Sequence, residues 1–167
     1  HQFGLPQIGK QVEASLAAGS QKNRTIQIGK KIFPLGKRTY IMGILNITPD
    51  SFSDGGKFLD EEAAAMQAEK MLEEGADIID IGGESTRPGA KPVSSRDEIN
   101  RVVPIIKRVY RSTKAIISID TRNSVVAKEA LEAGAQMVND ISGLRYDKKM
   151  AKIISEYRAA GCIMHSK

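Results

Sequence analysis

The sequence predicts a parallel α/β fold that makes up about the first half of a (β/α)8 (TIM) barrel. From Tyr40 onward, apolar runs of strand length alternate with segments of helical periodicity, an order that indicates parallel strands joined by right-handed crossovers. These strands are apolar on both faces, as in a sheet covered by helices or closed into a barrel. One face of each strand carries a polar group at or near its C-terminal end, where barrel enzymes build their sites.

Two smaller elements are expected ahead of the alternating region. Residues 5–18 carry apolar side chains spaced for one helical face, which predicts a short helix. The apolar runs 26–28 and 32–35 lie on either side of Gly29 and predict a small β-hairpin.

Four βα units and the start of a fifth strand follow. Asp60 is the expected N-cap of the first helix, and Ser95 with Glu98 predicts a capping box for the second. The units run as strand 40–45, helix 60–75, strand 78–82, helix from 95, strand 115–119, helix 123–133, strand 136–141, a helix ending before Gly161, and strand 162–165.

The open doubly wound sheet is the alternative architecture. No G-x-G-x-x-G follows the first strand, which argues against its dinucleotide-binding form. A complete barrel needs about 250 residues, so we expect this chain to be a fragment of one.

Composition excludes several classes of protein. No apolar run approaches the roughly 20 residues of a membrane span, and the net charge of +5 comes from Lys and Arg scattered among twenty acids. We therefore expect neither a membrane nor a nucleic-acid partner. Cys162 is the single cysteine and lacks a visible activating base, which favours a reducing cytoplasm and a small core residue. His1 and His165 are the only histidines, too few for a histidine metal cluster.

Two long polar loops follow the first two strands. Residues 46–56 are rich in turn formers yet contain Phe52, and a simple βα connection needs only about two to six residues. The second loop begins with the pair Gly82-Gly83 and carries Arg87, whose guanidinium suits a carboxylate or phosphate. A functional role is favoured over an ordinary turn in the first of these loops.

Each of three polar residues at or near the C-terminal end of a predicted strand has two possible interpretations. Asp120 either binds the ring N–H groups of a heterocycle or caps the next helix. Asn139, followed by Asp140, either stabilises a turn or binds a planar ligand. Asp80 lies between isoleucines and is either a ligand group or a structural partner of the loop around Arg87, with the structural role favoured.

At these residues the chain resembles the dihydropteroate synthases of the folate pathway. The resemblance covers about 40–167 and rests on MGILNITPDSFSDGG (42–56), GADIIDIGGESTRPGA (75–90), SIDT (118–121), GAQMVNDISG (134–143) and IMH (163–165). It implies a (β/α)8 barrel transferase, the target of sulfonamides, that joins 6-hydroxymethyl-7,8-dihydropterin pyrophosphate to p-aminobenzoate with Mg²⁺. Residues 1–24 are then a helical extension, and 25–167 are the pterin-binding barrel domain, truncated on its C-terminal side.

The resemblance also implies roles for individual residues. Asn46 is similar to the family's metal and pyrophosphate ligand, and Asp120 with Asn139 to its pterin-recognition pair, lined by Ile141 and Met164. Asp120 and Arg87 are the residues to which the resemblance assigns catalysis. The two loops over p-aminobenzoate would contribute Phe52, Asp54, Thr86, Arg87 and Pro88.

The family's later strands supply further groups: a second pterin-binding Asp, a Lys near the second substrate and an Arg/His pair for pyrophosphate. None follows within this sequence, so we expect these 167 residues alone to bind pterin poorly and to be nearly inactive. The full-length protein is expected to be a homodimer.

Two alternative functions remain. One is a pterin-binding methyltransferase barrel that passes a methyl group from a folate to a corrinoid protein, against which the TPDSFSDGG and STRPG segments argue. The other is a non-catalytic half-barrel module, against which the intact polar residues at the strand ends argue.

Overall fold

The computed structural model describes residues 9–14, 24–47, 57–84 and 93–165. They belong to two compact units, one from 1–27 and 32–39 and the other from 28–31 and 40–167. Residues 9–14 are helical, inside the range predicted for the first helix.

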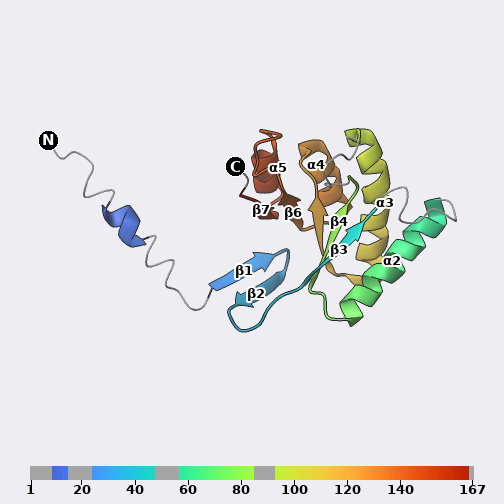
Figure 1. The fold of residues 1–167 in the computed structure, drawn as a ribbon, viewed down its shortest axis with the longest axis horizontal. Helices are drawn as coiled ribbons and strands as arrows, with labels where there is room; N and C mark the ends of the chain where they lie inside the picture. The colour runs from blue at the N-terminus through green and yellow to red at the C-terminus, as the bar shows by residue number, and fades with distance from the viewer. Residues whose placement is uncertain (1–8, 15–23, 48–56, 85–92, 166–167) are drawn as a thin grey trace. The chain divides into compact units, whose positions relative to one another are not determined.

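The expected hairpin is confirmed. Strands β1 (Arg24–Ile28) and β2 (Lys31–Leu35) form a two-stranded sheet (Figure 1). The two residues between them include Gly29 at φ 57°, a left-handed conformation that glycine adopts without a Cβ clash. So short a connection joins only antiparallel strands.

A parallel five-stranded sheet forms the second unit. Its strands are β3 (Met42–Asn46), β4 (Ile78–Gly82), β5 (Ile116–Asp120), β6 (Met137–Asp140) and β7 (Ala160–Ile163). They lie side by side in sequence order, and every neighbouring pair is parallel. A doubly wound sheet reverses its strand order at a switch point, whereas a barrel adds each strand beside the last. The order is therefore that of a barrel, which the described strands do not close.

The helices cover one face of this sheet. They are α2 (Lys57–Glu73), α3 (Ser95–Thr113), α4 (Ser124–Ala133) and α5 (Met150–Glu156). Each packs against the next along the chain, so that they form a single layer (Figure 1).

The hydrophobic core lies between sheet and helices, because alternate strand residues point to the helix layer. The strands contribute six fully buried or nearly buried side chains: Leu45, Ile79, Ile81, Ile117, Ile119 and Val138. The helices meet them with Ala64, Ala68, Val102, Ile106, Val109, Val126, Ala130 and Met150. The remaining strand positions face away from the helices, toward the side that is the interior in a closed barrel.

The cap of α3 differs from the prediction by one residue. Ser94 is the N-cap, with an extended backbone, and its Oγ accepts from the Asp97 N–H at 3.1 Å. Both serines suit this position, and the backbone places the earlier one there. Glu98, expected in the capping box with Ser95, is instead fully buried.

Three further expectations were wrong. Helix α2 begins at Lys57, so Asp60 lies inside it and is not its N-cap. Strand β7 begins at Ala160, because the chain turns after α5 at Arg158 with φ 49° and not at Gly161. Cys162 is consequently an exposed residue of β7 and not part of the core.

Candidate functional site

Polar side chains meet in one row across the C-terminal ends of the strands. The register aligns Asn46 with Gly82, Gly82 with Asp120, Asp120 with Asn139 and Asn139 with Cys162. Because these positions alternate with the buried core positions of their strands, the row lies on the face away from the helices. The structure thus brings together Asn46, Asp120 and Asn139, which the sequence predicted as site residues.

Gly82 leaves an opening in this row. A Cβ atom at Gly82 would lie 3.5 Å from Oδ1 of Asn46 and 3.6 Å from Oδ2 of Asp120. The missing side chain therefore leaves an amide oxygen and a carboxylate oxygen facing one space. Two oxygen atoms arranged in this way suit a cation or the N–H groups of a ligand.

Asp80 supports the row from the level below. It is 3% exposed, and its Oδ2 accepts a hydrogen bond from Nδ2 of Asn139 at 2.9 Å. Its Oδ1 has no hydrogen-bond partner among the described residues. The favoured structural role was expected to involve the loop around Arg87, which lies outside the described residues; the partner that the structure does show is Asn139.

Asp120 is surrounded by negative charge. Burial and, in decreasing order, the negative charges of Asp80, Glu98, Asp140 and Glu84 together raise its pKa to about 6. A carboxyl group with this pKa is ionised near neutral pH, yet it titrates within the physiological range.

The helix-capping interpretation of Asp120 is wrong, because the N-cap of α4 is Asn123. Asp140 performs the turn role that was considered for the Asn139–Asp140 pair. It is fully buried and accepts from the N–H groups of Ser142 at 2.7 Å and Leu144 at 3.0 Å. Asn139 does not take part in this turn, and its side chain lies on the face of the sheet away from the helices.

A second polar cluster lies beside the row. Nη2 of Arg122 is 3.0 Å from Oε1 of Glu84, and the Arg122 guanidinium stacks 4.4 Å from the Tyr146 ring centroid. Oε2 of Glu98 accepts from Nδ2 of Asn123 at 2.9 Å. Burial raises the pKa of Glu98, and the Glu84 charge adds to that effect, whereas hydrogen bonds from Thr121 and Asn123 oppose it.

Sequence reasoning missed this cluster, although one signal for it exists. Glu98 lies four residues before Val102, on the apolar stripe that continues through Ile105 and Val109. A charged residue at a buried helical position needs a polar partner. The position of Glu98 on the apolar stripe is therefore the signal in the sequence for a buried polar cluster.

The other predicted site residues are less completely placed. Ile141 follows β6 and is half-buried, whereas Met164 follows β7 and is 47% exposed. The N–H of Met164 donates to the Asp140 carbonyl at 3.2 Å, so these two strand ends adjoin. Five residues predicted on the loops lie outside the described residues: Phe52, Asp54, Thr86, Arg87 and Pro88.

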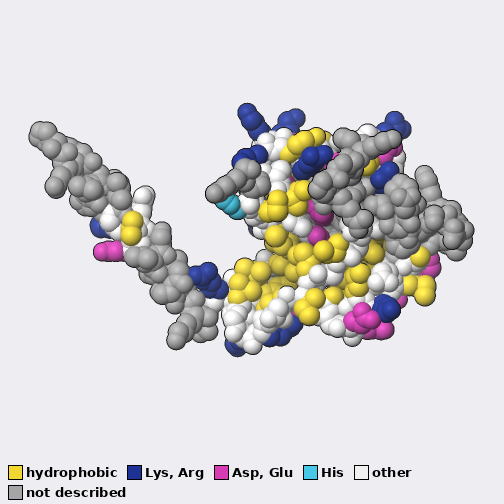
Figure 2. All heavy atoms as spheres, viewed as in Figure 1, with side chains coloured by type: hydrophobic (Ala, Val, Ile, Leu, Met, Phe, Trp, Pro, Cys, Tyr) yellow, Lys and Arg dark blue, Asp and Glu magenta, His cyan; other side chains and the backbone are white. Residues whose placement is uncertain are grey.

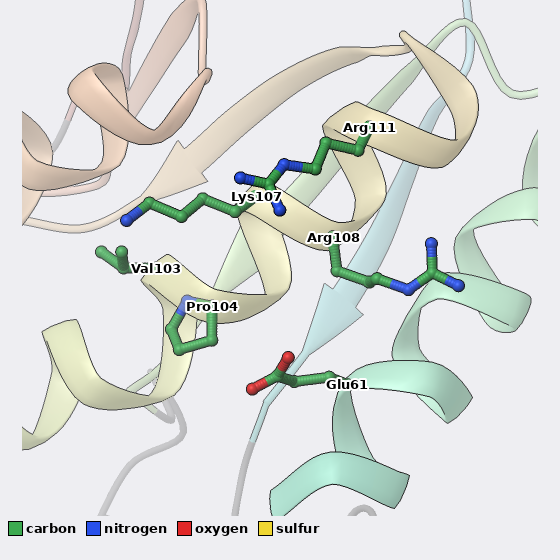
Figure 3. Close-up of a pocket in the computed structure, with 6 residues that line it drawn as sticks. All are labelled: Glu61, Val103, Pro104, Lys107, Arg108 and Arg111. Carbon is green, nitrogen blue, oxygen red and sulfur yellow. The ribbon is translucent and has the colours of Figure 1, made fainter.

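A separate hollow of about 300 Å³ lies on the helix layer (Figure 3). It is lined by Glu61 of α2 and by residues of α3, among them the exposed cations Lys107 and Arg111. Arg108 also lines it, but this side chain makes a bidentate ion pair with Glu62 at 2.8–3.1 Å. Exposed cations without converging buried groups do not form a binding site, so the row at the strand ends is the stronger candidate.

No group of three or more His, Cys, Asp or Glu side chains among the described residues is arranged to hold a metal ion. No described helix has the length and apolar character needed to cross a membrane.

Comparisons with known proteins agree on one family. The model of a family described as pterin binding enzyme matches residues 42–167. A dihydropteroate synthase of Clostridium beijerinckii is 54% identical over 142 residues, which cover 85% of this chain and 53% of that protein. A folate synthesis bifunctional protein of Arabidopsis thaliana is 43% identical over 170 residues, which cover 99% of this chain and 35% of that protein. The chain thus spans about half the length, or less, of these relatives.

Solved structures agree with that result. A dihydropteroate synthase from Clostridium difficile, determined with pteroic acid, superposes with a TM-score of 0.76 at 57% identity, covering 79% of this chain and 50% of that one. One from Xanthomonas albilineans, with 4-aminobenzoic acid, gives 0.78 at 41% identity, covering 86% and 52%. The prediction of a partial (β/α)8 barrel is confirmed.

Proposed function

Because this chain belongs to the pterin-binding enzyme family, we propose that the natural protein carrying it is a dihydropteroate synthase of folate biosynthesis. The reaction would join 6-hydroxymethyl-7,8-dihydropterin pyrophosphate to p-aminobenzoate. The observation that carries the proposal is the row of Asn46, Asp120 and Asn139 around the opening at Gly82. Relatives with 49–54% identity carry the name of this enzyme.

Asp120 and Asn139 would recognise the pterin ring. An ionised carboxylate only accepts hydrogen bonds, whereas an amide both donates and accepts. A reduced pterin presents N–H donors beside ring acceptors, which this pair matches. Ile141 and Met164 would provide the apolar walls against which the ring packs.

The reaction exchanges one bond for another at the pterin methylene carbon. The C–O bond to pyrophosphate breaks, and its electron pair leaves with the pyrophosphate. The lone pair of the p-aminobenzoate nitrogen forms the new C–N bond, and that nitrogen then loses a proton. If C–O cleavage runs ahead of attack, positive charge grows on the methylene, and an anionic Asp120 near the ring would stabilise it.

The residues also fit the expected Mg²⁺. This ion binds oxygen ligands and is commonly held by one or two protein groups together with water and substrate phosphates. Asn46 would supply an amide oxygen at the open space that Gly82 leaves. When bound there, Mg²⁺ would neutralise charge on the departing pyrophosphate. Arg87, a sequence prediction outside the described residues, would share that charge.

The remaining features of the proposal concern the whole protein. We propose that it works in the cytoplasm as a homodimer with small-molecule partners only. The single cysteine and the dispersed basic residues support the location and the absence of a nucleic-acid partner. The loops that contain Phe52, Asp54, Thr86 and Pro88 would cover p-aminobenzoate.

An activity measurement tests the function. The natural polypeptide containing these residues is incubated with both substrates and Mg²⁺, and dihydropteroate and pyrophosphate are quantified. Equal amounts of the two products are expected, with none when p-aminobenzoate is omitted. Absence of dihydropteroate, with methyl transfer from a methylated folate to a corrinoid protein instead, would overturn the proposal in favour of the methyltransferase alternative.

A second measurement tests the order of bond changes. Substrate labelled with ¹⁸O at the bridging oxygen is incubated without p-aminobenzoate, and the position of the label is followed. Movement of the label is expected if C–O cleavage precedes attack; a fixed label counts against early cleavage.

A further inference from the structure

We propose that Asp80 is a positioning residue for substrate recognition, which holds the amide of Asn139 in a single orientation toward the ligand. The inference rests on the proposed function and adds a specific residue to it. Asp80 would not touch the substrate; it would act through the hydrogen bond that its Oδ2 accepts from Nδ2 of Asn139 at 2.9 Å.

The hydrogen bond joins side chains of two strands that are separated by a third strand. Asp80 is on β4 and Asn139 on β6, with β5 between them. Strands in a sheet lie about 4.8 Å apart, so the two backbones are roughly 10 Å from one another. The residue of β5 at the level of Asp80 is Ser118, and its small side chain leaves room for the two longer ones to meet above it.

The chemistry of the two groups fixes the direction of the amide. Nδ2 of Asn139 donates to Oδ2 of Asp80, so the NH₂ group of Asn139 faces Asp80. The amide oxygen of Asn139 and its second N–H are then the atoms left to meet a ligand. Without Asp80, a rotation of half a turn about the last side-chain bond would exchange the oxygen and nitrogen and present the wrong pattern.

Burial makes Asp80 a firm support for this orientation. The residue is 3% exposed, whereas Asn139 is half-buried and borders the open face. Its other carboxylate oxygen, Oδ1, has no partner in the described part of the chain, so no described donor competes with Asn139. A buried acceptor beneath a half-exposed amide is the arrangement expected of a residue that positions a ligand-binding group.

A double-mutant cycle in the natural full-length protein tests the proposal. The dissociation constant of 6-hydroxymethyl-7,8-dihydropterin pyrophosphate is measured by calorimetry at pH 8, where Asp120 is ionised, for the wild type, Asp80→Ala, Asn139→Ala and the double variant. We expect Asp80→Ala to weaken binding by about 10- to 100-fold, the range for a hydrogen bond to a charged group. The double variant is expected to bind no more weakly than Asn139→Ala, because Asp80 acts through Asn139.

Two further variants separate positioning from folding. Asp80→Asn keeps an oxygen that can accept from Asn139 and is expected to stay within about threefold of the wild type. Ser118→Ala is the matched control, because Ser118 is buried at the same level but makes no hydrogen bond with Asn139. Its affinity is expected to be unchanged. The KM for p-aminobenzoate should not change in Asp80→Asn or Ser118→Ala.

The outcomes distinguish this proposal from the function on which it rests. Additive losses in the cycle, or wild-type affinity in Asp80→Ala, would overturn the positioning role while the wild type still makes dihydropteroate. A wild type that makes no dihydropteroate would overturn the proposed function itself. If Asp80→Ala does not fold, as judged by thermal unfolding, Asp80→Leu in the same cycle replaces it, with the same outcomes deciding.

Discussion

Asp120 connects the pH dependence of ligand binding to that of folding. Its pKa in the folded protein is about 6, above the value of 3.8 for an unperturbed side chain. The folded state therefore favours the protonated form. The stabilising contribution of this group is complete below about pH 3.8 and is lost as the pH rises through about 6.

Binding is expected to depend on pH in the opposite direction. Under the proposed function, recognition of pterin N–H groups would need the ionised carboxylate, so affinity for the pterin pyrophosphate should fall as the pH drops below about 6. Calorimetric titrations from pH 5 to pH 8 measure this. In Asp120→Asn the binding should be weaker at every pH, and this pH dependence should disappear. A midpoint that stays the same in Asp120→Asn would assign the titration to another group.

Glu98 offers an independent prediction about stability. Burial raises its pKa above 4.5, so its contribution to stability is present at low pH and lost as the pH rises through the folded value. Glu98→Gln keeps an acceptor for Asn123 without the buried charge. The thermal unfolding midpoint of this variant, relative to that of the wild type, should therefore increase from pH 5 to pH 8. Circular dichroism measures both midpoints, and a constant difference would contradict the expectation.

The adjacent residues Gly82 and Gly83, at the end of strand β4, are glycines for different structural reasons. At Gly83, a Cβ would lie 2.8 Å from Cγ1 of Val102 and 3.2 Å from Cγ of Glu98, so strand and helix α3 approach too closely for a side chain. At Gly82, a Cβ would meet Asn46 and Asp120 at ordinary contact distances of 3.5–3.6 Å. Gly83 permits the close packing of β4 against α3, whereas Gly82 keeps the space beside Asn46 and Asp120 open.

Matched alanine variants should separate these two effects. Gly83→Ala is expected to lower the free energy of unfolding by about 1–3 kcal/mol through overpacking. Gly82→Ala should leave that free energy nearly unchanged but weaken pterin pyrophosphate binding, because a methyl group enters the space beside Asn46 and Asp120. Urea unfolding and calorimetry, both applied to each variant, check the expectation. Equal losses of stability in the two variants would refute the distinction.

At the scale of the whole molecule, the inner face of the sheet is partly apolar and uncovered among the described residues. Ile44, on the row below Asn46, is 61% exposed, and Met164, two residues after Cys162 of the row, is 47% exposed. Figure 2 shows hydrophobic side chains gathered over the strands of the sheet on the face toward the viewer. Exposed apolar surface of this kind promotes association.

We therefore expect the 167-residue chain, expressed alone, to bind a hydrophobic dye and to self-associate, and to form dihydropteroate at a small fraction of the rate of the natural protein. Dye fluorescence, light scattering and product formation, compared at equal concentrations, measure this. The surface variant Ile44→Thr should reduce dye binding without changing the unfolding midpoint greatly. A monodisperse chain with weak dye fluorescence would show that this face is covered in solution.

The order of strands and helices could be predicted from the sequence because it depends on the periodicity of apolar side chains among neighbouring residues. Apolar runs of strand length and helical stripes identify parallel βα units, and polar residues at alternate positions identify the strand ends, as for Asn46, Asp120 and Asn139. Several element boundaries differ from the prediction. Ser94 and Ser95 are equally good caps by residue type, and the turn at Arg158 uses a left-handed backbone without a glycine to signal it.

The order of the elements, the kind of fold and the strand ends that carry polar groups therefore follow from the amino-acid sequence alone. Which polar groups pair with one another depends on the three-dimensional arrangement of the strands and helices. Asp80 and Asn139 are 59 residues apart in the chain and meet across β5, and Glu98 meets Asn123 from another helix. The physical reason is that periodicity is a property of neighbouring residues, whereas a hydrogen-bond partner depends on strand register and on which intervening side chains are small.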